Sequence, residues 1–182
     1  AVVTQLIEAG AEINDPAAFM LACSRGHEAV VSQLIQAGVN VNDQAESGYT
    51  AFMMACSPCC GYEAVVSLLI QAGANVNDHD ENGRTVLMAA CTGGHEAVVM
   101  QLIEAGADID ARTLEGDTAL MEACREGHDR IVKQLLDAGA DIDCVDVNCD
   151  NVFDIAHASG NTEMITMLEN AQISTDEMAD SA

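Results

Sequence analysis

Apolar residues along the chain form pairs of short helical patterns that are separated by glycine. In residues 83–110 the stretch VLMAAC follows Thr85, and HEAVVMQLIEA follows two glycines. The second stretch is apolar at positions 98, 99, 102 and 103, which is the spacing of one helix face. Thr85 can cap a helix start, and Gly106 suits a left-handed helix end. The pattern predicts a helix, a turn, a second helix and then a polar loop or hairpin over 107–117.

This unit recurs along the whole chain. Segments similar to EAVVMQLIEAG are found five times, and their glycines at 10, 38, 73, 106 and 139 are spaced 28, 35, 33 and 33 residues apart. A unit this small cannot bury its own apolar faces, so neighbouring units must stack into a solenoid. We therefore predict one domain over 1–170, made of a partial repeat at 1–14, repeats at about 15–42, 43–77, 78–110 and 111–143, and a C-terminal capping repeat at 144–170; a polar tail follows at 171–182.

The start of each unit carries a family resemblance. The motifs are GYTAFM at 48–53, GRTVLM at 83–88 and GDTALM at 116–121, together with Gly-His at 26, 94 and 127. They resemble the ankyrin repeat over roughly residues 1–170. The resemblance implies an all-α solenoid of helix-turn-helix repeats with short β-hairpin loops. It also implies that partners bind the concave side, at the hairpin tips and the exposed face of the first helices.

Several positions depart from the family pattern. Ankyrin repeats usually have Thr-Pro-Leu-His at the first helix, whereas this chain has Ala or Val for Pro, and has Met for His at positions 20, 53, 88 and 121. We expect Met packing to replace the usual polar network between repeats.

The unit at 15–42 lacks about five residues, so its hairpin is expected to be short or absent. The chain opens on a second helix without its partner, which favours further sequence upstream of Ala1. In the last unit Asn151, Asp154 and His157 are expected to supply a polar outer face.

Charge and composition narrow the range of partners. The net charge is −24, from 6 basic and 30 acidic residues, and this field repels nucleic acid. No apolar run reaches the roughly 18–20 residues that a membrane span needs. Aromatic residues make up only 3% and Trp is absent, so small aliphatic residues, Met and Cys must form the core. The charge predicts a partner with a basic surface; solubility alone is the alternative reading.

The eight cysteines divide into two groups. Cys23, Cys56, Cys91 and Cys124 occupy one repeated position near the end of the first helix, which predicts packing. We interpret the cysteines as reduced thiols and expect a cytoplasmic protein. Cys59 and Cys60 lie in a helix–helix turn that is two residues longer than its siblings. A zinc site needs four ligands of known spacing, so we predict neither a metal site nor a cofactor.

Other side chains that could take part in catalysis or metal binding also recur with the repeat. His27, His95 and His128 follow Gly at the start of the second helix, with Tyr62 in their place in the third unit, which suggests hydrogen bonding at the helix start. Carboxylates fill the loops but match no calcium-loop spacing, which favours a solvated acidic rim. The sequence holds no recognisable catalytic triad or phosphate-binding loop. We therefore expect a protein without enzymatic activity.

Positions that vary between repeats are free for recognition, whereas repeated positions serve packing. Tyr49, Arg84, Arg112 and Leu114 are the expected anchors, because aromatic, Arg and exposed apolar groups dominate binding hot spots. The resemblance places the partner-binding residues at Glu46, Tyr49, His79, Glu81, Arg84, Arg112, Leu114 and Asp117.

These observations favour a monomeric protein–protein interaction module, a scaffold or adaptor that binds a protein or peptide with a basic surface. The first alternative is a targeting or regulatory segment of a larger enzyme or effector whose catalytic part lies outside this chain. The second is a metal or thiol-redox protein that uses Cys59 and Cys60. The third is a repeat array that has no selected partner.

Overall fold

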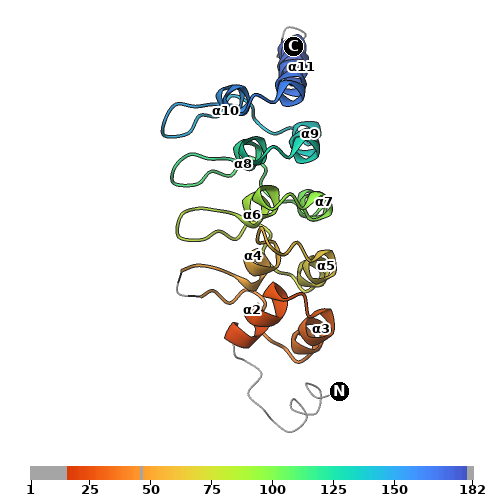
Figure 1. Ribbon diagram of the computed structural model, residues 1–182. Helices are drawn as coiled ribbons and strands as arrows, with labels where there is room; N and C mark the ends of the chain where they lie inside the picture. Colours follow the sequence, from red (N-terminus) through yellow and green to blue (C-terminus); the bar gives the residue numbers. More distant parts are fainter. Residues whose placement is uncertain (1–15, 46, 180–182) are drawn as a thin grey trace.

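The repeats stack in a single column in which two rows of helices run side by side. The structure is a computed structural model that describes residues 16–45 and 47–179, with side chains described as far as residue 173. First helices form one row, second helices form the other, and loops project from the first row (Figure 1). The helices in chain order are α2 (Pro16–Ser24), α3 (Glu28–Gln36), α4 (Ala51–Ala55), α5 (Glu63–Gln71), α6 (Val86–Thr92), α7 (Glu96–Glu104), α8 (Ala119–Glu126), α9 (Asp129–Asp137), α10 (Val152–Ser159) and α11 (Thr162–Ala179). The predicted all-α solenoid is confirmed.

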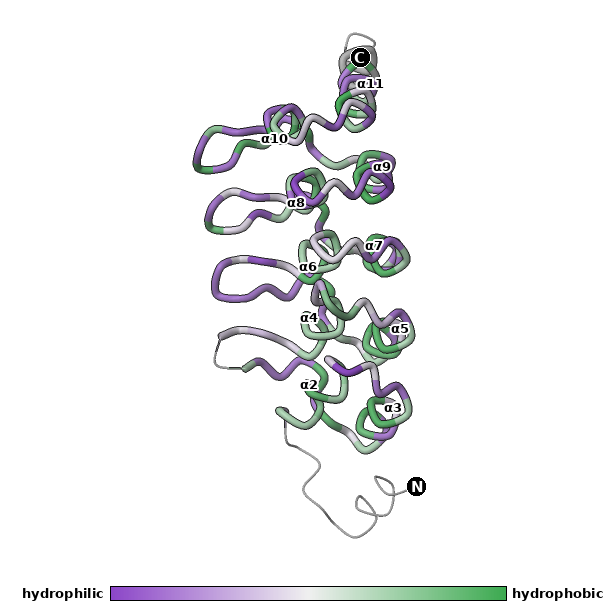
Figure 2. Tube along the Cα trace, in the orientation of Figure 1, coloured by the Kyte–Doolittle hydropathy of each residue, from purple (hydrophilic) through white to green (hydrophobic). Residues whose placement is uncertain are grey.

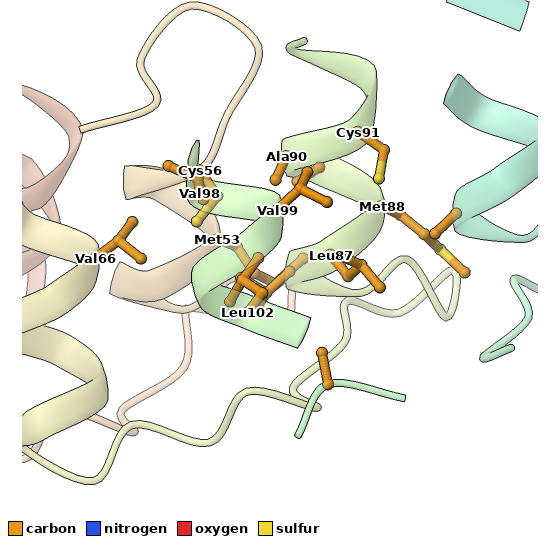
Figure 3. Close-up of a cluster of buried hydrophobic side chains, with 14 of the residues drawn as sticks. Met53, Cys56, Val66, Leu87, Met88, Ala90, Cys91, Val98, Val99 and Leu102 are labelled. Carbon is orange, nitrogen blue, oxygen red and sulfur yellow. The ribbon is translucent and has the colours of Figure 1, made fainter. Parts of the chain in front are cut away.

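The core lies between the two rows and between successive repeats. In α6 every residue from Val86 to Cys91 is buried, because this helix is covered by neighbours on both sides. In α7 Val98, Val99 and Leu102 are buried, whereas Met100 on the other side is exposed. Side chains from neighbouring repeats meet in one cluster (Figure 3). Hydrophilic residues concentrate on the projecting loops, so the apolar positions of the sequence coincide with the stack (Figure 2).

Methionine fills the position where the family usually has histidine. Met53, Met88 and Met121 are at most 1% exposed, which agrees with the expected Met packing. Each also contributes its backbone N–H to the threonine that begins its helix. The hydroxyl oxygens of Thr50, Thr85 and Thr118 accept these hydrogen bonds at 3.3 Å, which confirms the predicted cap.

The loops before the first helices are short hairpins whose tips hydrogen-bond to one another. Leu114 N–H donates to Asn82 O, and Val147 N–H donates to Glu115 O, both at 2.8 Å. Gly116 has φ +85°, and an added Cβ would lie 3.1 Å from the backbone of the next hairpin. Cys149 holds the equivalent place in the last hairpin with φ +67°, and no hairpin follows it in the described part. Neighbouring backbone therefore leaves room for a side chain only at this end.

Second helices are connected to the preceding repeat by polar side chains at their first turn. His95 Nε2 lies 3.0 Å from Ser57 O, and His128 Nε2 lies 3.3 Å from Thr92 O. Neither side chain caps its own helix, so the hydrogen bond predicted at the helix start is made to the preceding repeat instead. The ring packs over the turn of the previous repeat, where a Cβ at Gly61 would meet the His95 ring at 2.3 Å. The recurrent Gly-His motif is therefore a connection between repeats.

The C-terminal end differs from the expected polar tail at 171–182. Helix α11 continues to Ala179, beyond the boundary at residue 170. No Gly or Pro interrupts residues 162–179, so backbone hydrogen bonding can continue along the helix. At the start of this unit Asn151 and Asp154 form a reciprocal capping box, while Asp154 and His157 face solvent. The expected partial repeat at 1–14, and the short hairpin after it, lie outside the described residues.

A ladder of Asn and Asp side chains joins the ends of successive second helices. Asn77 Oδ1 accepts from Asp108 N–H at 2.7 Å, and Asn77 Nδ2 donates to Gly106 O at 3.4 Å. One repeat later Asp110 accepts from Asp141 N–H at 2.8 Å. An ionised carboxylate is an acceptor only, so Asp110 cannot donate to Gly139 O as Asn77 donates to Gly106 O.

We predict that Asp110→Asn restores the missing donor and raises the free energy of unfolding by roughly 0.5–1 kcal/mol. Asn77→Asp should have the opposite effect, since it removes the donor that Gly106 O uses. Urea unfolding followed by circular dichroism measures both changes. Asp143→Asn is the control for charge, because Asp143 lies at the equivalent exposed position one repeat later. Equal stabilisation by Asp143→Asn and Asp110→Asn would assign the effect to charge and contradict the hydrogen-bond explanation.

Candidate functional site

The residues just before the helix caps lie along one face of the stack. Tyr49, Arg84 and Asp117 each precede the threonine that begins α4, α6 or α8, so the stacking places them in successive repeats at equivalent positions. Together with the hairpins they form what we call the hairpin face. It comprises the described residues of the hairpins at 44–45 and 47–50, 79–85, 112–118 and 145–151, together with the first helices from which they project (Figure 1).

A hollow of about 310 Å³ opens on the hairpin face between two repeats. Its lining residues come from α4, α6 and the segments beside them: Tyr49, Met53, Ser57, Pro58, Arg84, Ala89 and Thr92. Tyr49 is half-buried and packs against the core, so its ring is held in place where it lines the hollow. The hydroxyls of Ser57 and Thr92 and the guanidinium of Arg84 supply polar groups nearby. The hollow can therefore accept an apolar side chain with a polar end.

An ionic network lies beside the hollow and crosses into the next repeat. Glu122 on α8 is only 8% exposed, and its carboxylate lies 3.7 Å from Arg84 Nη1 and 3.5 Å from Arg125 Nη1. Thr92 Oγ1 is 3.0 Å from Glu122 Oε2 and also accepts from Arg84 Nη2. Arg125 Nη2 lies 2.8 Å from Asp117 Oδ1. Two cations and two anions balance one another, so Arg84 and Asp117 have partners within the protein.

The other predicted binding residues differ in their exposure and in their contacts within the protein. Arg112 donates from Nε to Gly116 O at 3.2 Å and from Nη2 to Val145 O, so its guanidinium connects two hairpins. Leu114 is 76% exposed at a hairpin tip. His79 and Glu81 are exposed, and His79 Nδ1 lies 3.0 Å from Asp80 O. Glu46 lies outside the described residues. Tyr49 and Leu114 are therefore the predicted anchors that offer apolar surface.

Sequence reasoning missed two parts of this face. Glu122 and Arg125 were not among the predicted residues, although Glu122 replaces the apolar Met54 and Ala89 of the earlier repeats. That difference between repeats was the available signal. Val147, 67% exposed, is the second missed part and occupies the same tip position as Leu114. The two hairpins are joined by the hydrogen bond from Val147 N–H to Glu115 O, so their apolar tips are held on adjacent hairpins.

Buried carboxylates shape the hairpins rather than offering reactive groups. Asp146 Oδ1 accepts from the backbone N–H groups of Asn148 at 2.8 Å and Asp150 at 3.0 Å. The hydrogen bond from Asp150, followed by those from Asn148, lowers the pKa of Asp146 below its usual value. Asp80 makes the same pair of contacts with the N–H groups of Asn82 and Arg84. The side chains of Asp80 and Asp146 therefore determine the conformation of their hairpins through these hydrogen bonds.

The repeated cysteines are packing residues. Cys23, Cys56, Cys91 and Cys124 are fully buried. Burial raises the pKa of Cys23 and Cys124 to about 12 and also raises the pKa of Cys56 and Cys91.

Across the described residues, no three His, Cys, Asp or Glu side chains are grouped so that they could hold a metal ion. No helix in the described part of the chain is long and apolar enough to cross a membrane.

Comparison with known protein families gives a match over most of the chain. A family model described as ankyrin repeats (3 copies) matches residues 1–80 and 59–146. These ranges include the hollow, the ionic network and three of the four hairpins. A comparison with curated proteins finds no match.

We predict that Glu122→Gln lowers the free energy of unfolding by about 1–2 kcal/mol, because a nearly buried carboxylate with three partners is neutralised. Arg84→Gln should be milder, since Arg84 is more exposed. A double-mutant cycle in urea should give a coupling energy of roughly 0.5–1 kcal/mol for the pair. Strictly additive single effects would show that Arg84 and Glu122 do not interact in solution.

We also predict that Asp146 contributes to unfolding at low pH. Because its pKa is lowered in the folded state, its stabilisation is present above about pH 3.9, the unfolded value, and is lost as the pH falls through the folded pKa. Asp146→Asn should flatten the dependence of Tm on pH in this acidic window. Thermal unfolding between about pH 5 and pH 2 tests this. An unchanged slope in Asp146→Asn would contradict the assignment.

Proposed function

Because the chain belongs to the ankyrin-repeat family, whose repeats are generally protein–protein interaction modules, we propose that it binds a protein or peptide with a basic surface on its hairpin face. The observation that carries the proposal is the hollow beside Tyr49, which combines an aromatic ring packed against the core with polar groups. It is an opening on the side of the stack where residues differ from repeat to repeat. The second helices, by contrast, are nearly identical in sequence and serve packing.

Charge supports the choice of a basic partner. The chain carries a net charge of −24, and exposed carboxylates such as Glu81 and Glu115 lie on the hairpin tips. An acidic surface attracts a basic partner over a distance and accelerates its association. The exposed side chains of Leu114 and Val147 add apolar contact area on two adjacent hairpins. We therefore propose a ligand segment in which Lys or Arg residues flank an apolar or aromatic residue.

Long-range attraction brings a ligand to the hairpin face but does not orient it there. The ionic network can supply this orientation. Arg84, Glu122 and Arg125 hold one another at defined positions beside the hollow. A preorganised polar surface loses less side-chain entropy when a ligand binds. We infer that this part of the face orients the ligand, whereas the hollow at Tyr49 receives its apolar side chain.

The same features support a scaffold or adaptor role without catalysis. His95 and His128 form hydrogen bonds between repeats, and the four repeated cysteines are buried, so these groups have structural roles. We propose that the protein acts as a monomer in a reducing, intracellular compartment such as the cytoplasm. Free cysteines throughout the described part support that placement.

The test uses a displayed library of random peptides rather than an unknown natural partner. We expect selection on the full chain to enrich peptides with Lys or Arg around an apolar residue. Their affinity should weaken as salt rises, since screening shortens the range of charge attraction to about 10 Å at 0.1 M ionic strength. Tyr49→Ala and Leu114→Ala should each weaken binding by about tenfold or more, as expected for hot-spot truncations above 1 kcal/mol.

Met100→Ala is the matched control, because Met100 is also an exposed apolar side chain but lies on α7 on the other side of the stack. It should leave affinity unchanged. Arg84 is left intact, since its replacement would disturb the contact with Glu122. If Met100→Ala weakens binding as much as Tyr49→Ala, the proposed face is wrong. If affinity is flat across the salt series, the basic character of the ligand is wrong.

A further inference from the structure

One helix–helix turn in the stack is longer than its equivalents. Helix α4 ends at Ala55 and α5 begins at Glu63, whereas α6 ends at Thr92 and α7 begins at Glu96. The sequence alignment of the two turns leaves two extra residues in the first of them, within the stretch Ser57 to Gly61. This longer turn carries the adjacent cysteines Cys59 and Cys60.

The two sulfur atoms of this turn are in contact. Cys59 Sγ lies 3.1 Å from Cys60 Sγ, and Ser57 Oγ lies 3.4 Å from Cys59 Sγ. Cys59 is exposed, whereas Cys60 is half-buried and donates its S–H to Ser24 O of the previous repeat at 3.3 Å. The turn thus offers one accessible sulfur and, in contact with it, a second sulfur that is held in place.

We propose that Cys59 and Cys60 form a peroxide-reactive thiol pair that closes reversibly into a disulfide within this turn. The contact distance favours this chemistry over zinc binding, because two thiolates on a tetrahedral zinc lie about 3.8 Å apart. Adjacent residues also have Cα atoms only about 3.8 Å apart, closer than the usual disulfide span of roughly 4.4–6.8 Å. A disulfide formed across that short span is strained and easily reduced, as a reversible modification requires.

The two sulfurs have different roles in the reaction. A hydrogen bond from Ser57, followed by one from Cys60, lowers the pKa of Cys59, which increases its thiolate fraction near neutral pH. Burial raises the pKa of Cys60, which stays a thiol. Accessible thiols of low pKa beside a second cysteine are the groups that peroxides oxidise first. Cys59 is therefore the attacking group and Cys60 the resolving group.

The oxidant is hydrogen peroxide, and the reaction has two balanced steps. The Cys59 thiolate attacks one peroxide oxygen, the O–O bond breaks, and hydroxide leaves and takes up a proton to become water. Cys59 is now a sulfenic acid. The Cys60 sulfur then attacks the Cys59 sulfur, an S–S bond forms, the S–O bond breaks, and the departing hydroxide leaves as water with the Cys60 proton. In total, two thiols and one peroxide give one disulfide and two waters.

Oxidation removes a contact with the preceding repeat from a turn that also contacts the next one. The disulfide removes the S–H donor from which Ser24 O accepts. In the same turn, Ser57 O accepts from His95 of the next repeat, and Ser57 and Pro58 line the hollow beside Tyr49. If the hollow binds the ligand, as proposed above, the redox state of the pair alters the shape of the binding site. The thiol chemistry itself does not depend on that proposal.

The other six cysteines provide an internal comparison. Cys23, Cys56, Cys91 and Cys124 are buried, and burial raises the pKa of each. Burial, followed by the nearby Asp141, also raises the pKa of Cys144. Cys149 is exposed but makes no thiol contact among the described residues. We therefore expect peroxide to act on the pair before it acts on any other thiol.

The test treats the reduced full chain with equimolar hydrogen peroxide at neutral pH and then counts thiols under denaturing conditions. We expect a fall from the eight thiols of the sequence to six, with the Cys59–Cys60 peptide lighter by two hydrogens. Dithiothreitol should restore all eight. In Cys60→Ser the reaction should stop at a sulfenic acid on Cys59, which dimedone labels. In Cys59→Ser the remaining seven thiols should persist.

Cys149→Ser is the matched control, because it removes the other exposed cysteine and should still form the disulfide. Circular dichroism of each variant establishes that the stack is folded. The proposal is overturned if Cys59 and Cys60 remain alkylatable, if Cys149 is consumed first, or if Cys59 pairs with another cysteine or another chain. Loss of peptide binding in Tyr49→Ala is measured separately, so the failure of the binding face and the failure of the thiol pair are distinguishable.

Discussion

The packing of each first helix between its two neighbours is the contact on which the rest of the structure depends. Helix α6 is buried from Val86 to Cys91, so it has almost no face of its own to turn toward water. Such a helix is stable only when the repeats before and after it are folded. This requirement explains why the apolar residues are small or flexible and recur at one spacing.

Stacking also determines which positions are free to vary. A hairpin, a helix-starting threonine and a first helix recur in every complete unit, so residues at packing positions are nearly the same each time. The residues before the caps and at the hairpin tips face outward, and there the chain has Tyr49, Arg84 and Asp117 at equivalent places. The hollow beside Tyr49 lies between two repeats, where Tyr49 of one repeat and Arg84 of the next both line it.

Polar groups connect the repeats where apolar packing ends. His95 and His128 reach back to carbonyl oxygens of the preceding repeat, and Asn161 reaches Asp129 at 2.7 Å in the last one. The Asn and Asp ladder does the same at the opposite end of the second helices. The turn with Cys59 and Cys60 departs from this pattern, since its extra residues place a thiol pair where other repeats have only a short connection.

The sequence by itself determined the fold, because the glycines and the apolar positions of the second helix repeat five times and only stacking satisfies this spacing. Threonine caps begin three of the first helices. It also indicated the variable positions before the caps and at the hairpin tips, although the nearly buried Glu122 differs between repeats as well. Only the tertiary structure decided what those residues do. Arg84 and Glu122 are far apart in the sequence, and their contact depends on how one repeat sits on the next. The same is true of His95, whose partner Ser57 belongs to the preceding repeat. The sequence pattern within one repeat therefore predicts its helices and their buried faces. Contacts between repeats depend instead on the length of the side chains and on how one repeat is aligned with the next.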